Sequence, residues 1–173
     1  MVQALVGRKG VEVSVTKALA AAGNYAAADV LSESASAGTA WNFVNVARIN
    51  GGTGTITKAI ALLETTALTP GITLFLFHTL PTSALNDNVA NTAVLHADEA
   101  NFIGRITFPA MADLGSGDSE AVVTPSLATG NLPLDFVTAA GDRDLYGIAV
   151  TRDAITGETA TDDLIIKLFV RQD

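Results

Sequence analysis

The run ITLFLF, residues 72–77, is the most concentrated apolar stretch of the chain. In a strand, successive side chains point to opposite faces of the sheet. One face of this run would hold Ile72, Leu74 and Leu76, and the other Thr73, Phe75 and Phe77. Both faces are largely apolar, which is typical of a strand in the middle of a sheet that is covered on two sides. The run therefore predicts the central strand of the fold.

The residues that follow this run are predicted to end the strand and turn the chain. Pro81 has no backbone N–H to donate to a neighbouring strand, so the strand should end before it. His78 is expected at the rim of the core, hydrogen-bonded rather than catalytic. Asn86, Asp87 and Asn88 favour a loop, because such side chains bond to nearby backbone groups. We expect this loop to turn the chain and to contact a neighbouring molecule.

Short strand-like runs separated by Gly, Pro and Asn recur along the rest of the chain. Roughly ten strands at spacings of about 8–20 residues predict an all-β fold, an antiparallel β-sandwich or jelly roll with little helix. The expected strands lie at residues 11–16, 25–31, 41–49, 55–63, 72–77, 103–108, 121–124, 132–138, 145–151 and 164–170.

Two connections have a more specific pattern. Residues 50–54, NGGTG, contain glycines that can adopt positive φ, and they lie between the strand-like runs 47–49 and 55–60. This arrangement predicts a hairpin. The Ala-rich residues 86–101 are expected to form at most a turn or two of helix.

A chain of 173 residues is long enough for one domain with a single core. We expect this domain to span residues 11–173. Residues 1–10 show neither strand nor helix periodicity and are predicted to form an extended arm. Such arms are often ordered only by a partner. Arg8 and Lys9, the adjacent basic pair of this arm, are therefore predicted to contact the partner.

The charge of the chain argues against several classes of partner. Asp and Glu number 18 against 10 Lys and Arg, for a formal charge of −8, which would repel nucleic-acid phosphates and anionic lipid surfaces. No apolar run approaches the roughly 18 residues of a membrane-spanning helix, and the first residues lack the apolar core of a secretory signal. We expect binding neither to nucleic acid nor to a membrane.

The sequence also lacks the patterns of catalysis and cofactor binding. There is no cysteine, and the pattern G-x-S-x-G of a nucleophilic serine is absent. His78 and His96 are too few and too far apart for a recognisable zinc motif. The acidic stretches lack the spacing of a calcium loop, and the glycines of residues 50–54 lack the Lys of a phosphate-binding loop. We expect no enzymatic activity, no cofactor and no metal site.

The order of several short motifs is more informative than any one of them. The motifs are YAAADVL at 25–31, ARINGG at 47–52, LFLF at 74–77, Pro81-Thr82, Asp87-Asn88, LYGI at 145–148 and the final Gln172-Asp173. In this order they resemble a family of tailed-bacteriophage structural proteins encoded among head genes, over residues 11–173. Where the family commonly reads Ala-Gly-Asp-Val, this chain has Ala at position 28, and we expect Ala28 to adopt an ordinary negative φ.

The resemblance implies a β-rich accessory protein of the virion, a decoration or cement protein on the capsid exterior. Such proteins are synthesised in the host cytoplasm, bind the major capsid protein and are typically homotrimers. The alternative is a carbohydrate- or receptor-binding jelly-roll module of a virion or tail, to which the loop at residues 86–88 would supply polar contacts.

Overall fold

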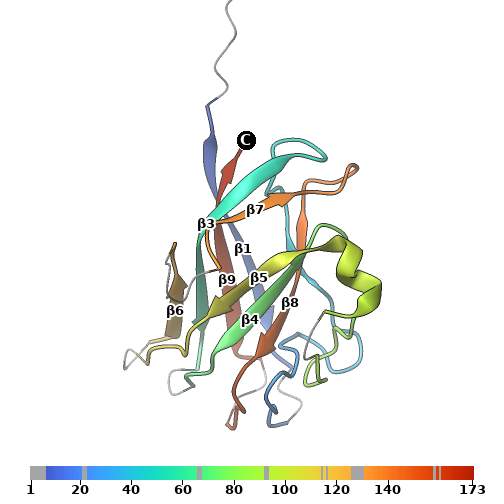
Figure 1. The fold of residues 1–173 in the computed structure, drawn as a ribbon. Coiled ribbons are helices and arrows are strands. Elements are labelled where there is room, and N and C mark those ends of the chain that lie inside the picture. Colours follow the sequence, from blue (N-terminus) through green and yellow to red (C-terminus); the bar gives the residue numbers. More distant parts are fainter. Residues whose placement is uncertain are drawn as a thin grey trace, which may run out of the picture.

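Two antiparallel sheets face each other and enclose the core of the protein (Figure 1). The computed structural model describes residues 7–20, 23–65, 68–91, 94–113, 115, 117–125, 131–157, 159 and 161–173. These residues form nine strands and one short 3-10 helix. The larger sheet has the order β1-β9-β3-β6, with β7 paired to one end of β3, and the smaller has the order β2-β8-β4-β5. The predicted all-β sandwich is thus confirmed.

The elements are short and irregularly spaced. The five-stranded sheet contains β1 (Lys9–Ala18), β3 (Thr53–Leu63), β6 (Ser119–Val123), β7 (Leu134–Val137) and β9 (Asp163–Gln172). The four-stranded sheet contains β2 (Trp41–Phe43), β4 (Ile72–Phe77), β5 (Phe102–Phe108) and β8 (Leu145–Thr151). The 3-10 helix η1 (His96–Asn101) lies within the stretch expected to form a helical turn or two. No helix among the described residues has the length and apolarity needed to span a membrane.

Strand β4 has the central position that its sequence predicts. It pairs with β8 on one side and β5 on the other, and all six of its residues are buried. Its inner face joins the large core between the sheets, to which Trp41 and Phe43 also belong. Its outer face contributes Phe75 and Phe77 to a second apolar cluster. That cluster also contains Val30, Ile148 and Val150, with Leu85 and Val94 packed against it.

The segment before β3 differs from the prediction. Residues 25–31 form only isolated bridges at Tyr25, Asp29 and Val30, and the strand expected at residues 41–49 ends at Phe43. Asn45 interrupts it by adopting a φ of 58°. The hairpin predicted around residues 50–54 is also wrong, because β2 and β3 belong to different sheets. The glycines instead turn the chain from one sheet to the other, with Gly51 at a φ of 67°.

The sandwich begins earlier than residue 11. Lys9 pairs with Gln172 and Gly10 with Arg171, so both residues belong to β1 and not to an arm. The partner strand β9 extends to Gln172, so its backbone groups are available to form hydrogen bonds with Lys9 and Gly10 of β1. Of the remaining arm, residues 1–6 lie outside the described part of the chain.

The ordinary φ expected for Ala28 is also wrong. Its φ is 72°, in the left-handed region that a side chain with a Cβ adopts at a cost of about 1–2 kcal/mol. Two backbone hydrogen bonds fix this conformation, because the Ala28 N–H donates to Thr151 O at 2.7 Å and the Ala28 O accepts from Asn91 N–H at 2.9 Å. The surrounding structure thus imposes the turn that glycine would adopt without strain.

Substituting Ala28 by glycine should therefore stabilise the protein. Relief of the Cβ strain outweighs the greater chain entropy of glycine, and we expect Ala28→Gly to raise the free energy of unfolding by about 0.5–1 kcal/mol. The neighbouring Ala27→Gly is the control, because Ala27 has no positive φ. In this variant the free energy of unfolding should fall by about 0.5–1 kcal/mol, since glycine adds chain entropy without relieving strain. Urea denaturation measures both variants. A lower free energy of unfolding for Ala28→Gly than for wild type would show that the positive φ of Ala28 is not strained.

Candidate functional site

The two histidines lie apart from any concentration of ligating groups. His78 is half-buried at the end of β4, where its backbone N–H donates to Asn101 O at 3.0 Å and its Nδ1 lies 3.1 Å from Thr79 Oγ1. His96 is exposed, with its Nδ1 3.0 Å from Glu99 Oε2. Within the part of the chain that the structure describes, no three His, Asp or Glu side chains converge as a metal site would require.

Asp87, predicted to contact a partner, is instead buried. Its side chain is 2% exposed and accepts hydrogen bonds from Tyr25 Oη at 3.0 and 2.9 Å and from Ser32 N–H at 2.8 Å. A buried carboxylate requires such partners, because loss of hydration would otherwise cost several kcal/mol. Asp87 is therefore an internal attachment point between two loops, and its carboxylate is not at the surface as a partner contact would need.

The two neighbouring amides are also engaged within the chain. Asn86 is half-buried, and its Oδ1 accepts from Gly38 N–H at 3.0 Å. Asn88 adopts a φ of 58°, and its amide, oriented with the nitrogen toward Asp29, donates to Asp29 Oδ2 at 2.8 Å. The loop at residues 86–88 thus turns the chain as predicted. Its polar groups hold it against residues 24–38.

Asp98 attaches the same long connection at a second point. It is 1% exposed and accepts from the backbone N–H groups of Thr82 and Ser83, at 2.8 and 2.9 Å, and from both hydroxyl groups. Burial alone would raise the pKa of Asp98, but the hydrogen bonds from Ser83 and Thr82 outweigh this effect and lower it. The hydrogen bonds of Asp87 and Asp98 thus fix the connection between β4 and β5, whose Leu85 and Val94 pack against the apolar cluster of Phe75 and Phe77 on the outer face of β4.

A buried ion pair fixes the end of β1. The Lys17 ammonium is 6% exposed; it pairs with the Glu33 carboxylate and donates to Thr39 O and to Thr39 Oγ1. It also lies 5.6 Å from the centre of the Trp41 ring. Burial lowers the pKa of Lys17, although Glu33 opposes this shift. For Glu33, burial would raise the pKa, but the bonds from Lys17, Thr39 and Ser32 lower it to about 2.

This pair should make stability depend on pH in the acid range. The folded-state pKa of Glu33 is about 2, below its ordinary value of 4.5, so its contribution is present above pH 4.5 and is lost as the pH falls toward 2. Glu33→Gln leaves Lys17 buried without its counter-ion. We expect it to lower the free energy of unfolding by about 2 kcal/mol at neutral pH, less than for a fully buried pair because Glu33 is partly exposed.

Urea denaturation at neutral pH and near pH 3 checks both effects. The difference between wild type and Glu33→Gln should shrink as the pH falls below 4.5, because the carboxylate becomes protonated in the unfolded chain while it remains ionised in the folded protein down to about pH 2. Glu99→Gln is the control, since the pair of Glu99 with His96 is exposed and should contribute little. An undiminished difference near pH 3 would contradict a role for the Glu33 charge.

The outer face of the five-stranded sheet is the candidate contact surface. Its apolar residues are half-buried or exposed and belong to neither apolar cluster: they are Ile60, Leu62, Val122, Ile165 and Phe169. The strand register places them side by side, with Leu62 opposite Ile165 and Ile60 opposite Val122. No described strand or helix packs over this face. We name these five residues the open face.

Charged residues of both signs border the open face. Lys58 Nζ lies 3.9 Å from the centre of the Phe169 ring, and Lys167 Nζ lies 3.4 Å from Glu12 Oε1. Glu120 lies opposite Leu62 on β6. Two cations and two anions thus accompany the apolar residues, so this surface is locally neutral in a chain of charge −8. A neutral apolar surface favours contact with another protein because little charge must be desolvated.

The other two predicted contact residues lie at one end of the sandwich. Arg8 is exposed, and its Nε lies 2.9 Å from Asp173 Oδ1. Lys9 is exposed and lines a groove of about 470 Å³ with Arg48 and Arg143. The structure leaves both side chains accessible. Among the described residues, no hydrogen bond or ion pair joins Arg8 or Lys9 to the loop at residues 86–88.

Sequence patterns could not identify the open face. The strands β3 and β9 carry apolar residues at both odd and even positions, so alternation does not distinguish the core side from the outer side. Only the register of three strands, β3, β6 and β9, shows that the outward residues are neighbours.

No protein-family model matches the sequence, and no curated protein does either. The bacteriophage resemblance therefore depends on the order of its motifs alone.

Proposed function

We propose that the protein is a structural component of a bacteriophage virion, a capsid decoration protein that binds the outer capsid surface between subunits of the major capsid protein. The observation that carries this proposal is the open face. It gives a rigid sandwich one uncovered, locally neutral apolar surface suited to a protein partner. The order of the sequence motifs supports the same class of protein. The proposal includes assembly as a homotrimer on the capsid exterior.

The physical effect of such a protein is to stabilise the shell. A molecule that binds the assembled capsid but not its dissociated subunits shifts the equilibrium toward the assembled state. Full burial of a large apolar side chain contributes about 1.5–3 kcal/mol, so a half-buried one contributes roughly 1 kcal/mol more when covered. Five such residues on the open face could together provide an anchor, and repetition over many copies multiplies the effect.

The alternative of a carbohydrate-binding module has less support. It depended on free polar groups in the loop at residues 86–88. The carboxylate of Asp87 and the side-chain oxygen of Asn86 both accept hydrogen bonds from within the chain. A sugar would have to displace these bonds.

A charged residue on the open face should weaken capsid attachment. We expect Ile60→Glu to reduce binding at least tenfold, because the introduced carboxylate would be desolvated in the interface. Ile49→Glu is the matched control: Ile49 is 68% exposed and lies outside the sheets. Binding is measured by co-sedimentation with expanded capsids of the encoding phage that lack this protein. The folded state of each variant is checked by thermal unfolding.

Electron cryo-microscopy of the same particles locates the bound protein. Density on the shell exterior, reduced in Ile60→Glu but not in Ile49→Glu, is the expected result. Wild-type protein that fails to bind the shell, or that is found only on the tail, would contradict the proposed function. Equal binding of both variants would show that the open face is not the contact surface.

A further inference from the structure

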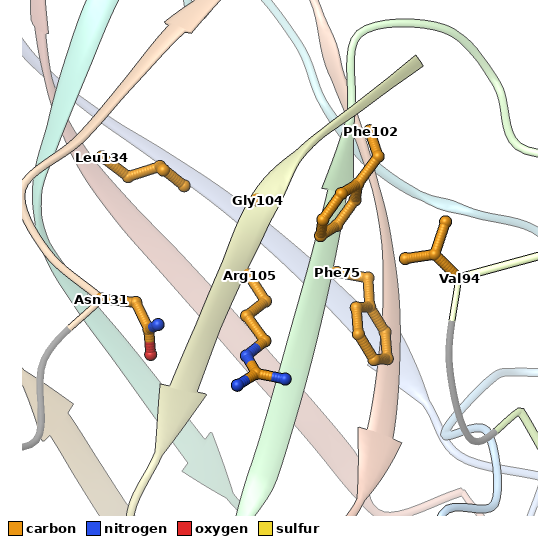
Figure 2. Close-up of a pocket in the computed structure, with 7 residues that line it drawn as sticks. All are labelled: Phe75, Val94, Phe102, Gly104, Arg105, Asn131 and Leu134. Carbon is orange, nitrogen blue, oxygen red and sulfur yellow. The ribbon is translucent and has the colours of Figure 1, made fainter. Parts of the chain in front are cut away.

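A pocket of about 440 Å³ lies on the opposite side of the sandwich, at the outer face of β4 and β5 (Figure 2). Its volume falls in the range of about 300–1,000 Å³ that is usual for ligand sites. The lining residues are Phe75, Val94, Phe102, Gly104, Arg105, Asn131 and Leu134. The pocket shares no residue with the open face: four of its seven lining residues lie on β4 and β5 of the other sheet, although Leu134 belongs to β7 of the five-stranded sheet.

Aromatic rings form one part of this pocket. The rings of Phe75 and Phe102 lie with centres 6.3 Å apart, and that of Phe77 lies 5.6 Å from Phe102, both pairs tilted by 55°. Phe102 is nevertheless 37% exposed, so a large apolar ring borders the pocket without being covered. An apolar group placed here would bury area that the fold itself leaves in water.

Two guanidinium groups flank the same aromatic ring. Arg105 is directly opposite Phe75 in the register of β4 and β5, and Figure 2 shows its side chain lying alongside the Phe75 ring. Arg152 lies with its guanidinium carbon 5.6 Å from the centre of that ring, and its Nε donates to Thr73 Oγ1 at 2.6 Å. Burial lowers the pKa of Arg152, and the positive charge of Arg105 lowers it further. The positive charges of Arg105 and Arg152 therefore repel each other.

No carboxylate of the described residues forms an ion pair with either guanidinium. An anion between Arg105 and Arg152 would relieve their mutual repulsion and could accept hydrogen bonds from the Arg105 fork. The pocket therefore combines an apolar surface with an uncompensated positive charge.

The pocket also adjoins an unpaired sheet edge. β5 pairs only with β4, so its other side has no hydrogen-bonded neighbour among the described strands. Gly104 lines the pocket on this edge strand, and a Cβ at that position would come within 2.9 Å of Leu134 Cδ1. An extended peptide could bond to free backbone groups of such an edge while its side chains enter the pocket. A compact small molecule could not use both features.

We propose that this pocket binds an extended segment of a protein partner in which an acidic residue stands two positions from a large apolar one, so that both side chains point to the same face of the segment. The carboxylate lies beside Arg105 and Arg152, and the apolar side chain lies against Phe75 and Phe102. This binding is separate from attachment through the open face, so either can fail without the other.

The test uses the full chain and a blocked peptide, acetyl-Phe-Val-Asp-Val-amide, in which Phe and Asp stand two positions apart, titrated by two-dimensional NMR. We expect saturable shift changes confined to β4, β5 and residues near Arg152. The same peptide with Asn in place of Asp should bind about tenfold more weakly, because it cannot pair with the guanidinium groups. Free 3-phenylpropanoate distinguishes a peptide ligand from a free organic acid, since it has the carboxylate and the ring but no peptide backbone.

Variants then assign the site. Arg105→Gln should weaken binding of the Asp peptide about tenfold while leaving thermal unfolding unchanged, because Arg105 is exposed. Arg105→Lys should weaken it less, since the charge remains but the planar fork is lost. Arg171→Gln is the matched control, an exposed strand arginine on the other sheet, and should bind as wild type.

Three results would overturn the proposal. Absence of binding at millimolar peptide would show that the arginines are merely solvated. Equal binding of the Asp and Asn peptides, or of Arg105→Gln and wild type, would show that charge recognition does not occur. Tighter binding of 3-phenylpropanoate than of the peptide would assign the pocket to a free organic acid. None of these results bears on capsid attachment through the open face.

Discussion

The rest of the structure depends on covering strand β4 on both of its faces. Each face of residues 72–77 carries large apolar side chains, so neither can remain in water without the loss of several kcal/mol. The opposing sheet covers the inner face. The outer face has no third sheet, and irregular segments that contribute Val30, Leu85 and Val94 pack there instead. Irregular backbone over a core must have its polar groups bonded, which explains why this chain buries Asp87 and other charged side chains nearby.

The same requirement makes the two sides of the sandwich different. Long connections between strands are used to cover the four-stranded sheet, and they are held by Asp87, Asp98 and the Lys17–Glu33 pair. On the other sheet, apolar residues such as Ile60 and Ile165 therefore remain at the surface. In a monomer this arrangement would expose an apolar patch to water, whereas a partner would remove it. The placement of the covering segments thus leaves the open face available for the proposed assembly.

The sequence predicted the regular strands well and the irregular segments poorly. The bounds of β4 and β8 agree with those expected at 72–77 and 145–151, because apolar periodicity and turn residues are local signals. The segment at residues 25–31 has the composition of a strand but is held as a turn by long-range bonds, such as that from Ala28 N–H to Thr151 O. Likewise, nothing local distinguishes a surface Asp in a turn from Asp87, whose donors lie more than fifty residues away in the chain. The burial of Asp87 could not be predicted from the sequence for this reason.

The open face and the pocket beside Phe75 have different consequences for a protein bound to a shell. They share no residue, and most of the strand residues that line the pocket lie on β4 and β5, so a molecule attached through the open face would leave the pocket uncovered by the shell. A pocket that the shell leaves uncovered cannot strengthen attachment to the subunits beneath it. It can only recruit a further chain, either from a neighbouring copy or from another component. The uncompensated charge of Arg105 and Arg152 is consistent with such a role, because it attracts an acidic segment without disturbing the locally neutral open face.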